Sequence, residues 1–300
     1  MKILSYGATG SQGHPVAQKL LAAAHQVRVL TRDPSKVQGL DGAEVITGDM
    51  SDQASLKTAS EGQEGVFLHI PFFTPSPTDG LTYANNALAA AKDAGVKLVV
   101  WNASGEISEA RSGNPAFDVR LDILEAIQNS GIPYIVLQPT AYMENFLGPW
   151  TREEIVNDNT FAYPTPLEVK MAWIATEDIG TFAVYAFAHP ELAPLNLKVS
   201  GPERLNGEEI AERFSRALGR EITFRAMPPE EFGEKLDAVF PGMGQGAAQG
   251  YAMAYEHPDR FSSHVDLEAA LAKMPVELTT LEQWVTKHAP AFATSEVEHA

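Results

Sequence analysis

The sequence predicts an α/β fold: a doubly wound parallel sheet with helices on both faces, followed by a small α+β C-terminal lobe. Three observations support this prediction. Short apolar runs recur through the first half, helical patterns lie between them, and a glycine-rich turn follows the first run. Parallel strands need crossover connections, and right-handed crossovers cover both faces of the sheet. The 300 residues suffice for one large domain with a smaller lobe.

Six apolar runs in the first half predict strands, because each is short and bounded by turn or helix signals. They span residues 2–6, 26–31, 43–47, 65–70, 97–101 and 134–137. After the first run, Val16, Leu20 and Leu21 recur at helical spacing. Further helices are expected at 83–94 and 119–129.

The second half is less regular and predicts a lobe that grows out of the sheet domain. A helix at 177–189 has apolar residues on one face, and the strand expected at 195–199 returns to the sheet. Asn206 is the expected N-cap of a helix at 207–218, which Gly219 ends.

The remaining segments set the expected domain limits. We expect a strand at 221–225, a helix at 228–240, a mobile glycine-rich loop at 241–250 and a disordered tail at 293–300. The sheet domain then covers residues 1–150, completed by segments near 174–200, and the interleaved lobe covers 151–292.

Composition argues against several classes of protein. The chain has no cysteine, which excludes disulfides and thiolate catalysis, and no histidine pattern of the His-Glu-x-x-His kind predicts a metal site. A net charge of −17 argues against nucleic-acid binding and fits either a solubilising surface or a basic partner protein. No apolar run approaches the ~20 residues of a membrane span, and no secretory signal is recognisable, so we expect a cytoplasmic protein without membrane contact.

The strongest chemical signal is the segment GATGSQG at residues 7–13, between the first strand and the first helix. Gly7 permits a tight turn, Gly10 lets the backbone approach a pyrophosphate, and Gly13 lets the helix pack close to the strand. The helix N-terminus then offers free N–H groups to the phosphates. A turn without a ligand is the alternative. We predict a dinucleotide site, with loop hydrogen bonds from Thr9, Ser11 and Gln12.

The end of the second strand indicates which dinucleotide binds. An acidic residue there favours NAD, whereas this chain has Arg32, whose planar fork suits a 2′-phosphate, and Lys36 nearby. Asp33 partly offsets this charge, and Arg32 is alternatively a solvated loop residue. The pattern predicts NADP(H) in preference to NAD(H).

With these residues in place, the chain resembles the NmrA-like family of atypical short-chain dehydrogenases/reductases. The resemblance rests on GATGSQG, on LTRDPSK at 30–36, on the Gly-Asp-Met segment at 48–50 and on LQPTAYMENF at 137–146, where Gln138 replaces the usual Arg. It continues weakly through WIATEDIG at 173–180 and covers about residues 1–225. The resemblance implies a Rossmann domain with a small C-terminal lobe, a substrate cleft between them, and an adenine flanked by Asp49 and Met50.

The same resemblance places two unusual residues at the catalytic positions. Short-chain dehydrogenases use a Tyr-x-x-x-Lys pair, and the matching positions here hold Ala116 and Arg120. Ala116 transfers no proton, while Arg120 can bond ribose hydroxyls but stays protonated. Arg120 is alternatively an ordinary solvent-facing helix residue.

Three side chains are therefore further catalytic candidates. Ser104 follows the fifth strand, where the family's Ser or Thr polarises a carbonyl, and His69 and Tyr142 are candidate proton donors. Each is alternatively a structural residue. Other strand-end residues expected at the cofactor are Ile70, Pro71, Ala103 and Pro139, beside His69 and Arg120.

A hydride acceptor that is itself a good electrophile needs no strong acid, only an apolar pocket beside the nicotinamide. The expected lining residues, which are alternatively core residues, are Phe72, Phe73, Tyr142, Met143, Phe146 and Trp173. The sequence therefore predicts an NADPH-dependent oxidoreductase acting on a small, quinone- or enone-like molecule. The alternative is a catalytically silent NADP(H) sensor acting through a protein partner. Helices flanking such sheets can form dimers, so a homodimer stays open.

Overall fold

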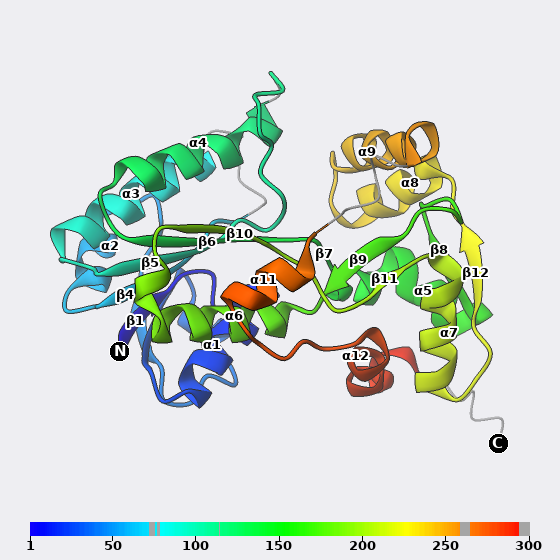
Figure 1. Cartoon of the computed structure of the whole chain (residues 1–300), viewed down its shortest axis with the longest axis horizontal. Helices are drawn as coiled ribbons and strands as arrows, with labels where there is room; N and C mark the ends of the chain where they lie inside the picture. The colour runs from blue at the N-terminus through cyan, green and yellow to red at the C-terminus, as the bar shows by residue number, and fades with distance from the viewer. Residues whose placement is uncertain (72–75, 77–78, 114, 259–264, 294–300) are drawn as a thin grey trace. The chain divides into compact units, whose positions relative to one another are not determined.

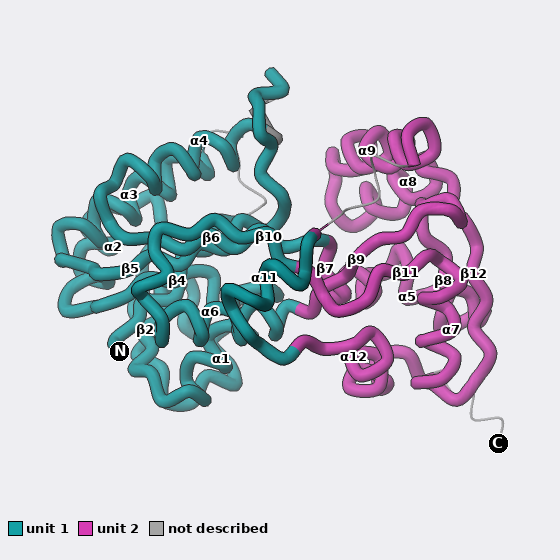
Figure 2. Tube along the Cα trace, in the orientation of Figure 1, with its two compact units in different colours: residues 1–140, 176–199, 266–277 teal, residues 141–175, 200–265, 278–300 magenta. Residues whose placement is uncertain are grey.

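The computed structural model describes residues 1–71, 76, 79–113, 115–258 and 265–293. The chain divides into two compact units (Figure 2). Unit 1 contains residues 1–140, 176–199 and 266–277, and unit 2 contains 141–175, 200–265 and 278–300. The chain therefore passes between the units more than once. Residues 266–277, expected in the lobe, pack in unit 1.

Unit 1 is built on a sheet of seven strands in the order β10-β6-β5-β4-β1-β2-β3 (Figure 1). Every neighbouring pair in it is parallel. The bounds are β1 Lys2–Ser5, β2 Gln26–Thr31, β3 Glu44–Thr47, β4 Gly65–His69, β5 Leu98–Asn102, β6 Tyr134–Pro139 and β10 Leu195–Val199. The order reverses between β1 and β4, and the carboxyl ends of strands at such a switch point are where ligands bind. The predicted doubly wound parallel fold is confirmed.

Helices cover both faces of this sheet. On one face α2 (Gln53–Ser60), α3 (Asp79–Asp93) and α4 (Pro115–Asn129) pack in sequence, and on the other α1 (Gly13–Ala22) packs on α6 (Thr176–Ala188). The short α11 (Leu267–Lys273) contacts β10. Two 3₁₀ turns, η1 (Pro34–Lys36) and η3 (Pro190–Leu192), complete the unit. The central strands are largely apolar because helices bury both of their faces, and their polar residues stand mostly at or near the carboxyl ends.

Unit 2 has two small sheets around an aromatic core. One sheet joins β7 (Ala141–Tyr142), β9 (Met171–Ile174) and β11 (Arg204–Leu205), and the other joins β8 (Thr160–Tyr163) to β12 (Thr223–Ala226). Its helical segments are η2 (Met143–Leu147), α5 (Pro149–Asp158), α7 (Gly207–Leu218), α8 (Pro229–Val239), α9 (Gly244–Glu256), α12 (Leu281–Lys287) and η4 (Ala289–Phe292). Asn206 caps α7, and Gly219 ends it with φ +66°, as predicted.

The expected loop at 241–250 is wrong, because α9 begins at Gly244. A Cβ on Gly244 would stand 2.2 Å from the carbonyl oxygen of Gly233 in α8, and a Cβ on Gly233 would stand 2.8 Å from that of Gly244. These glycines therefore permit a close helix–helix contact.

In the described ranges no helix has both the length and the apolarity that a membrane crossing requires.

Candidate functional site

The glycine turn after β1 has no room for a side chain at two of its three glycines. Gly7 has φ +72°, and its carbonyl oxygen accepts a 2.9 Å hydrogen bond from the Gly10 N–H. A Cβ on Gly13 would lie 2.3 Å from that same oxygen, whereas a Cβ on Gly10 would have no neighbour closer than 3.4 Å. A Cβ on Gly7 would lie 2.5 Å from Cδ2 of His69. Gly7 and Gly13 are therefore required by contacts within the protein, while the space beside Gly10 is open.

Helix α1 starts at this turn without a cap of its own. Its N-cap residue Gln12 makes no side-chain capping bond, and the first turn of the helix has no acidic residue. By contrast, Asp52 caps α2 with its carboxylate. The His14 N–H in the first turn already donates to the Gly10 carbonyl at 3.0 Å and Pro15 has no N–H, so it is the positive end of the helix that suits a phosphate. This arrangement fits the pyrophosphate of a dinucleotide. Thr9 and Ser11 are exposed at the same turn.

At the end of β2, the side chain of Arg32 is exposed, whereas the carboxylate of Asp33 is hydrogen-bonded within the following turn. The side chain of Arg32 is 84% exposed, and its Nε lies 3.8 Å from Oδ2 of Asp49. The carboxylate of Asp33 instead caps η1, accepting from the backbone N–H (3.1 Å) and hydroxyl (2.6 Å) of Ser35, and these bonds lower the pKa of Asp33. Lys36 is exposed at the end of η1. The guanidinium of Arg32 is therefore accessible to a ligand.

Asp49 and Met50 follow β3 in a turn fixed by its own hydrogen bonds. Asp49 accepts from the N–H (2.8 Å) and hydroxyl (2.6 Å) of Ser51, which lowers the pKa of Asp49. The carbonyl of Met50 accepts from the Asn86 amide at 3.1 Å, and its side chain packs half-buried on the core. Contact of these two residues with adenine stays a prediction.

A polar cluster joins the ends of β4 and β5 to the glycine turn. The hydroxyl of Ser104 donates to Oε1 of Gln12 at 2.9 Å and lies 3.4 Å from Nδ1 of His69. Asn102 donates to the same Gln12 oxygen at 3.2 Å. Ser104 has φ +55°, a left-handed conformation that is costly for a residue with a Cβ. Sequence analysis missed Asn102, a polar residue ending an otherwise apolar strand.

His69 is a neutral imidazole at physiological pH. Burial lowers its pKa to about 4 because the charged form would lose its solvation. With the Ser104 hydroxyl donating to Gln12, its oxygen can accept from Nδ1–H of His69, which assigns the proton to that nitrogen. Both polar protons of the pair are then used within the cluster, and the pair holds no imidazolium.

Arg120, on α4, is tied to the loop after β5. Its Nε donates to the carbonyl of Ala103 at 3.0 Å, and its Nη2 would lie 3.5 Å from a Cβ on Gly105. The half-buried side chain thus lies against this loop at the carboxyl edge of the sheet. Ribose contact by Arg120 stays a prediction. Of the other strand-end residues predicted at the cofactor, Ile70, Ala103 and Pro139 are buried and Pro71 is exposed.

Four of the remaining predicted residues lie in unit 2. Tyr142 is buried in unit 2, and Met143, Phe146 and Trp173 lie in that unit's core, where the rings of Phe146 and Trp173 are 4.4 Å apart. Phe72 and Phe73 lie outside the described residues. Substrate contact by these six residues stays a prediction.

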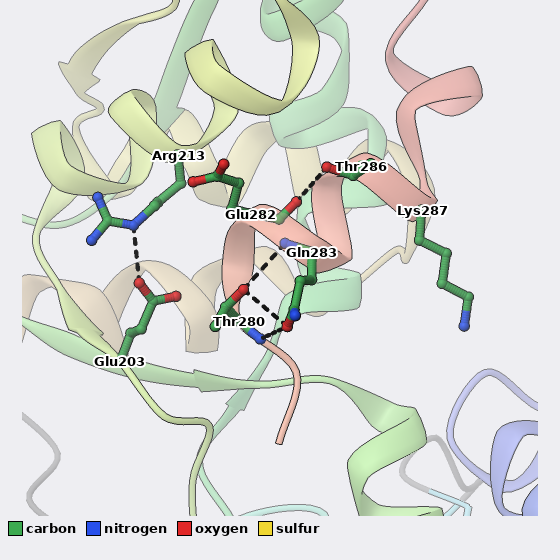
Figure 3. A pocket seen from close by; sticks show the side chains of 7 residues that line it. All are labelled: Glu203, Arg213, Thr280, Glu282, Gln283, Thr286 and Lys287. Atoms are coloured by element: carbon green, nitrogen blue, oxygen red, sulfur yellow. Dashed lines mark hydrogen bonds and ion pairs between the residues drawn. The ribbon is translucent and has the colours of Figure 1, made fainter. Parts of the chain in front are cut away.

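Unit 2 also has a polar depression of about 520 Å³ between α7 and α12 (Figure 3). Its side chains bond to each other and to the backbone. Glu203 accepts from Arg213 at 2.9 Å and from the Leu281 N–H at 2.8 Å, and Thr280 with Gln283 forms the capping box of α12. These contacts hold α12 in place and explain the depression's polar side chains without a ligand. Among the described residues, no three His, Asp or Glu gather as a metal site would require.

The parallel sheet, its glycine turn and the uncapped helix define a Rossmann-type dinucleotide-binding protein. The chain belongs to the NmrA-like family, whose model matches residues 1–285. The NAD(P)-binding oxidoreductases of that family are thus its relatives.

Two relatives and one solved structure illustrate the match. An NAD(P)H azoreductase of Xenophilus azovorans is 28% identical, over 98% of this chain and 100% of the relative. A (4-alkanoyl-5-oxo-2,5-dihydrofuran-3-yl)methyl phosphate reductase of Streptomyces griseus is 28% identical, over 97% of this chain and 99% of the relative. The triphenylmethane reductase of Citrobacter sp., complexed with NADP(H), superposes with a TM-score of 0.76 at 22% identity, over 96% of this chain and all of the other.

Proposed function

We propose that this protein is an NADPH-dependent reductase that delivers a hydride to a small, apolar, electron-poor acceptor of the quinone or enone kind. The observation that carries the proposal is the hydrogen-bonded cluster of Ser104, Gln12 and His69 beside the glycine turn. It brings a hydroxyl, with a neutral imidazole behind it, to the sheet edge at which the dinucleotide would bind.

A preference for NADP(H) over NAD(H) is part of the proposal. The accessible guanidinium of Arg32 suits a 2′-phosphate, and Lys36 adds a second charge nearby. Asp33 caps η1 through Oδ1 alone and stays ionised, so its charge partly offsets that of Arg32 and Lys36.

The chemistry suits acceptors that need little protonation. When bound, the reduced dinucleotide supplies the hydride. The Ser104 hydroxyl turns from Gln12 to an acceptor oxygen or nitrogen and polarises it by hydrogen bonding, while the Nδ1–H of His69 donates to the Ser104 oxygen, and water delivers the proton that completes the reduction. A quinone or a conjugated carbonyl stabilises the resulting anion by itself. The names of the two relatives denote reduction of an azo compound and of an unsaturated ring that carries a carbonyl group, which are acceptors of this kind.

The test is consumption of NADPH with a para-quinone, followed by nicotinamide absorbance. We expect turnover by the natural chain and a loss of about tenfold or more in kcat for Ser104→Ala. Lys92→Ala, which alters an exposed residue of α3, is the control and should keep full activity. The absence of turnover with quinone, enone and azo acceptors alike would contradict the proposal.

One observation favours a second candidate, an NADP(H)-sensing regulator. Ala116 stands at the expected Tyr position, and His69 is neutral, so neither supplies the strong acid of a typical dehydrogenase. A sensor would bind oxidised and reduced cofactor with different affinities and pass that difference to a protein partner. Calorimetry with NADP⁺ and NADPH tests this: equal affinities would contradict it.

A further inference from the structure

The loop after β5 is held by the side-chain amide of Gln138, a residue to which the candidate site assigns no role. Gln138 lies on β6 and is 6% exposed. Its Oε1 accepts the backbone N–H of Ile107 at 2.7 Å, and its Nε2 donates to Oδ1 of Asn196 on β10 at 2.5 Å. Side chains from the neighbouring strands β6 and β10 thus hold the loop that carries Ser104 in place.

The orientations of the side-chain amides of Gln138 and Asn196 follow from their hydrogen-bond partners. The Ile107 N–H can only donate, so Gln138 must present its oxygen to it. The Nε2 of Gln138 then faces Asn196, which must present oxygen in turn. Lys198, two residues further along β10, pairs with Glu106 in the same loop. The loop is therefore fastened at two successive residues.

These contacts bear on the strained residue of the site. Ser104 has φ +55° in a loop that is fixed on both sides, and its own N–H donates to Oδ1 of Asn102 at 3.0 Å. On one side the Ala103 N–H donates to the Leu137 carbonyl at 2.9 Å, and the Ala103 carbonyl accepts from Arg120. On the other side the Ile107 N–H is the buried anchor. Loss of that anchor would let the loop relax and turn the Ser104 hydroxyl away from Gln12.

We infer that Gln138 is a positioning residue: through the Ile107 N–H it sets the place of the Ser104 hydroxyl, and Asn196 accepts from the other end of its amide. The inference deepens the proposed reductase function, on which its catalytic consequence rests. It also explains why glutamine suits this chain where the family pattern has arginine. A guanidinium has no acceptor for the Ile107 N–H, so arginine would leave that buried N–H unpaired.

The test is hydrogen exchange of the Ile107 amide, because it reports on the loop whether or not turnover occurs. In Gln138→Leu we expect exchange of this amide to be faster by about tenfold or more. In Gln138→Glu the carboxylate still accepts the N–H, and Asn196 can turn its amide to donate, so protection should stay near that of the natural chain. Gln138→Arg should behave like Gln138→Leu.

Gln63→Leu is a matched control, because Gln63 is also 6% exposed but its Oε1 has no hydrogen-bond partner among the residues that the structure describes. It should leave Ile107 protection unchanged. Equal protection of Ile107 in Gln138→Leu and Gln63→Leu would overturn the inference. Should Gln138→Leu fail to fold, slow exchange of Ile107 in Gln138→Arg would overturn it equally.

Turnover gives the second readout. With a para-quinone, Gln138→Leu should lower kcat while the Kd for NADPH changes by less than about twofold, and Gln138→Glu should restore kcat. If neither the natural chain nor any variant consumes NADPH, the proposed function fails. The hydrogen-exchange rate of the Ile107 amide still decides the role of Gln138. An unchanged kcat in Gln138→Leu with Ile107 deprotected would contradict the catalytic consequence.

Discussion

The Ser104 hydroxyl donates a 2.9 Å hydrogen bond to Oε1 of Gln12, residues from two different strand–helix connections of the sheet. This bond joins the glycine turn to the loop after β5, so the two sides of the candidate site are one hydrogen-bonded structure. Asn102 donates to the same oxygen and reinforces the link. Changes on either side should therefore be felt on the other.

Alanine at Gly13 and at Gly10 should have different effects. A Cβ at Gly13 would stand 2.3 Å from a backbone oxygen, so Gly13→Ala should lower the free energy of unfolding by about 2 kcal/mol or more and weaken NADPH binding. Gly10→Ala meets nothing closer than 3.4 Å, so it should keep its stability but lose about tenfold or more in NADPH affinity, because the methyl group occupies the approach of the pyrophosphate. Urea unfolding and calorimetry measure the two quantities. Parallel losses in both variants would contradict this assignment.

Reversal of the charge at Arg32 should change cofactor preference. Arg32→Glu should raise the Kd for NADPH by about tenfold or more and leave the Kd for NADH within about twofold, because the proposed partner of this side chain is the 2′-phosphate, which NADH lacks. Lys92→Glu makes the same charge change on α3 and should alter neither value. Equal losses for NADPH and NADH in Arg32→Glu would refute the role of Arg32.

The strain at Ser104 can be separated from the role of its hydroxyl. Ser104→Ala and Ser104→Gly both remove the hydroxyl, but glycine adopts φ +55° without a Cβ penalty. We therefore expect Ser104→Gly to exceed Ser104→Ala in free energy of unfolding by about 1 kcal/mol, while both lose the same catalytic contact. Urea unfolding of both variants checks this. Equal stability would show that the loop relaxes freely.

His69 should make stability depend on pH in a defined window. Its folded pKa of about 4 lies below the ordinary value of 6.5, so the unfolded chain binds more protons between these values. The contribution of His69 is therefore complete above about pH 6.5 and falls by up to about 3 kcal/mol as pH drops towards 4. Urea unfolding of the natural chain and of His69→Gln across this pH range isolates the contribution of His69 to the free energy of unfolding. Identical pH slopes in the two proteins would contradict a buried, neutral imidazole.

The sheet was predictable because its information is local. Each strand of unit 1 is a short apolar run, and GATGSQG marks the turn from β1 into α1. Unit 2 was not predictable in the same way, because β8 pairs with β12 across some 60 residues of chain and β7, β9 and β11 are very short. The composition of residues 241–250 predicts a loop, but Gly233 and Gly244 serve a close helix contact that only the partner helix reveals.

Within the site, residue types were predictable and partners were not. Ser104, His69 and Gln12 were each expected near the cofactor, but only the fold shows that they bond to one another. Likewise, the sequence marks Gln138 only as a departure from a family pattern. Its acceptor role depends on the Ile107 N–H, which a loop of unpredictable shape brings to it.

The most direct test of the central claim is calorimetric titration of the cofactor-free protein with NADPH, NADP⁺, NADH and NAD⁺. The account predicts that both NADP forms bind about tenfold or more tightly than the corresponding NAD forms. Failure of all four dinucleotides to bind would contradict the assignment of the glycine turn and, with it, the proposed reductase.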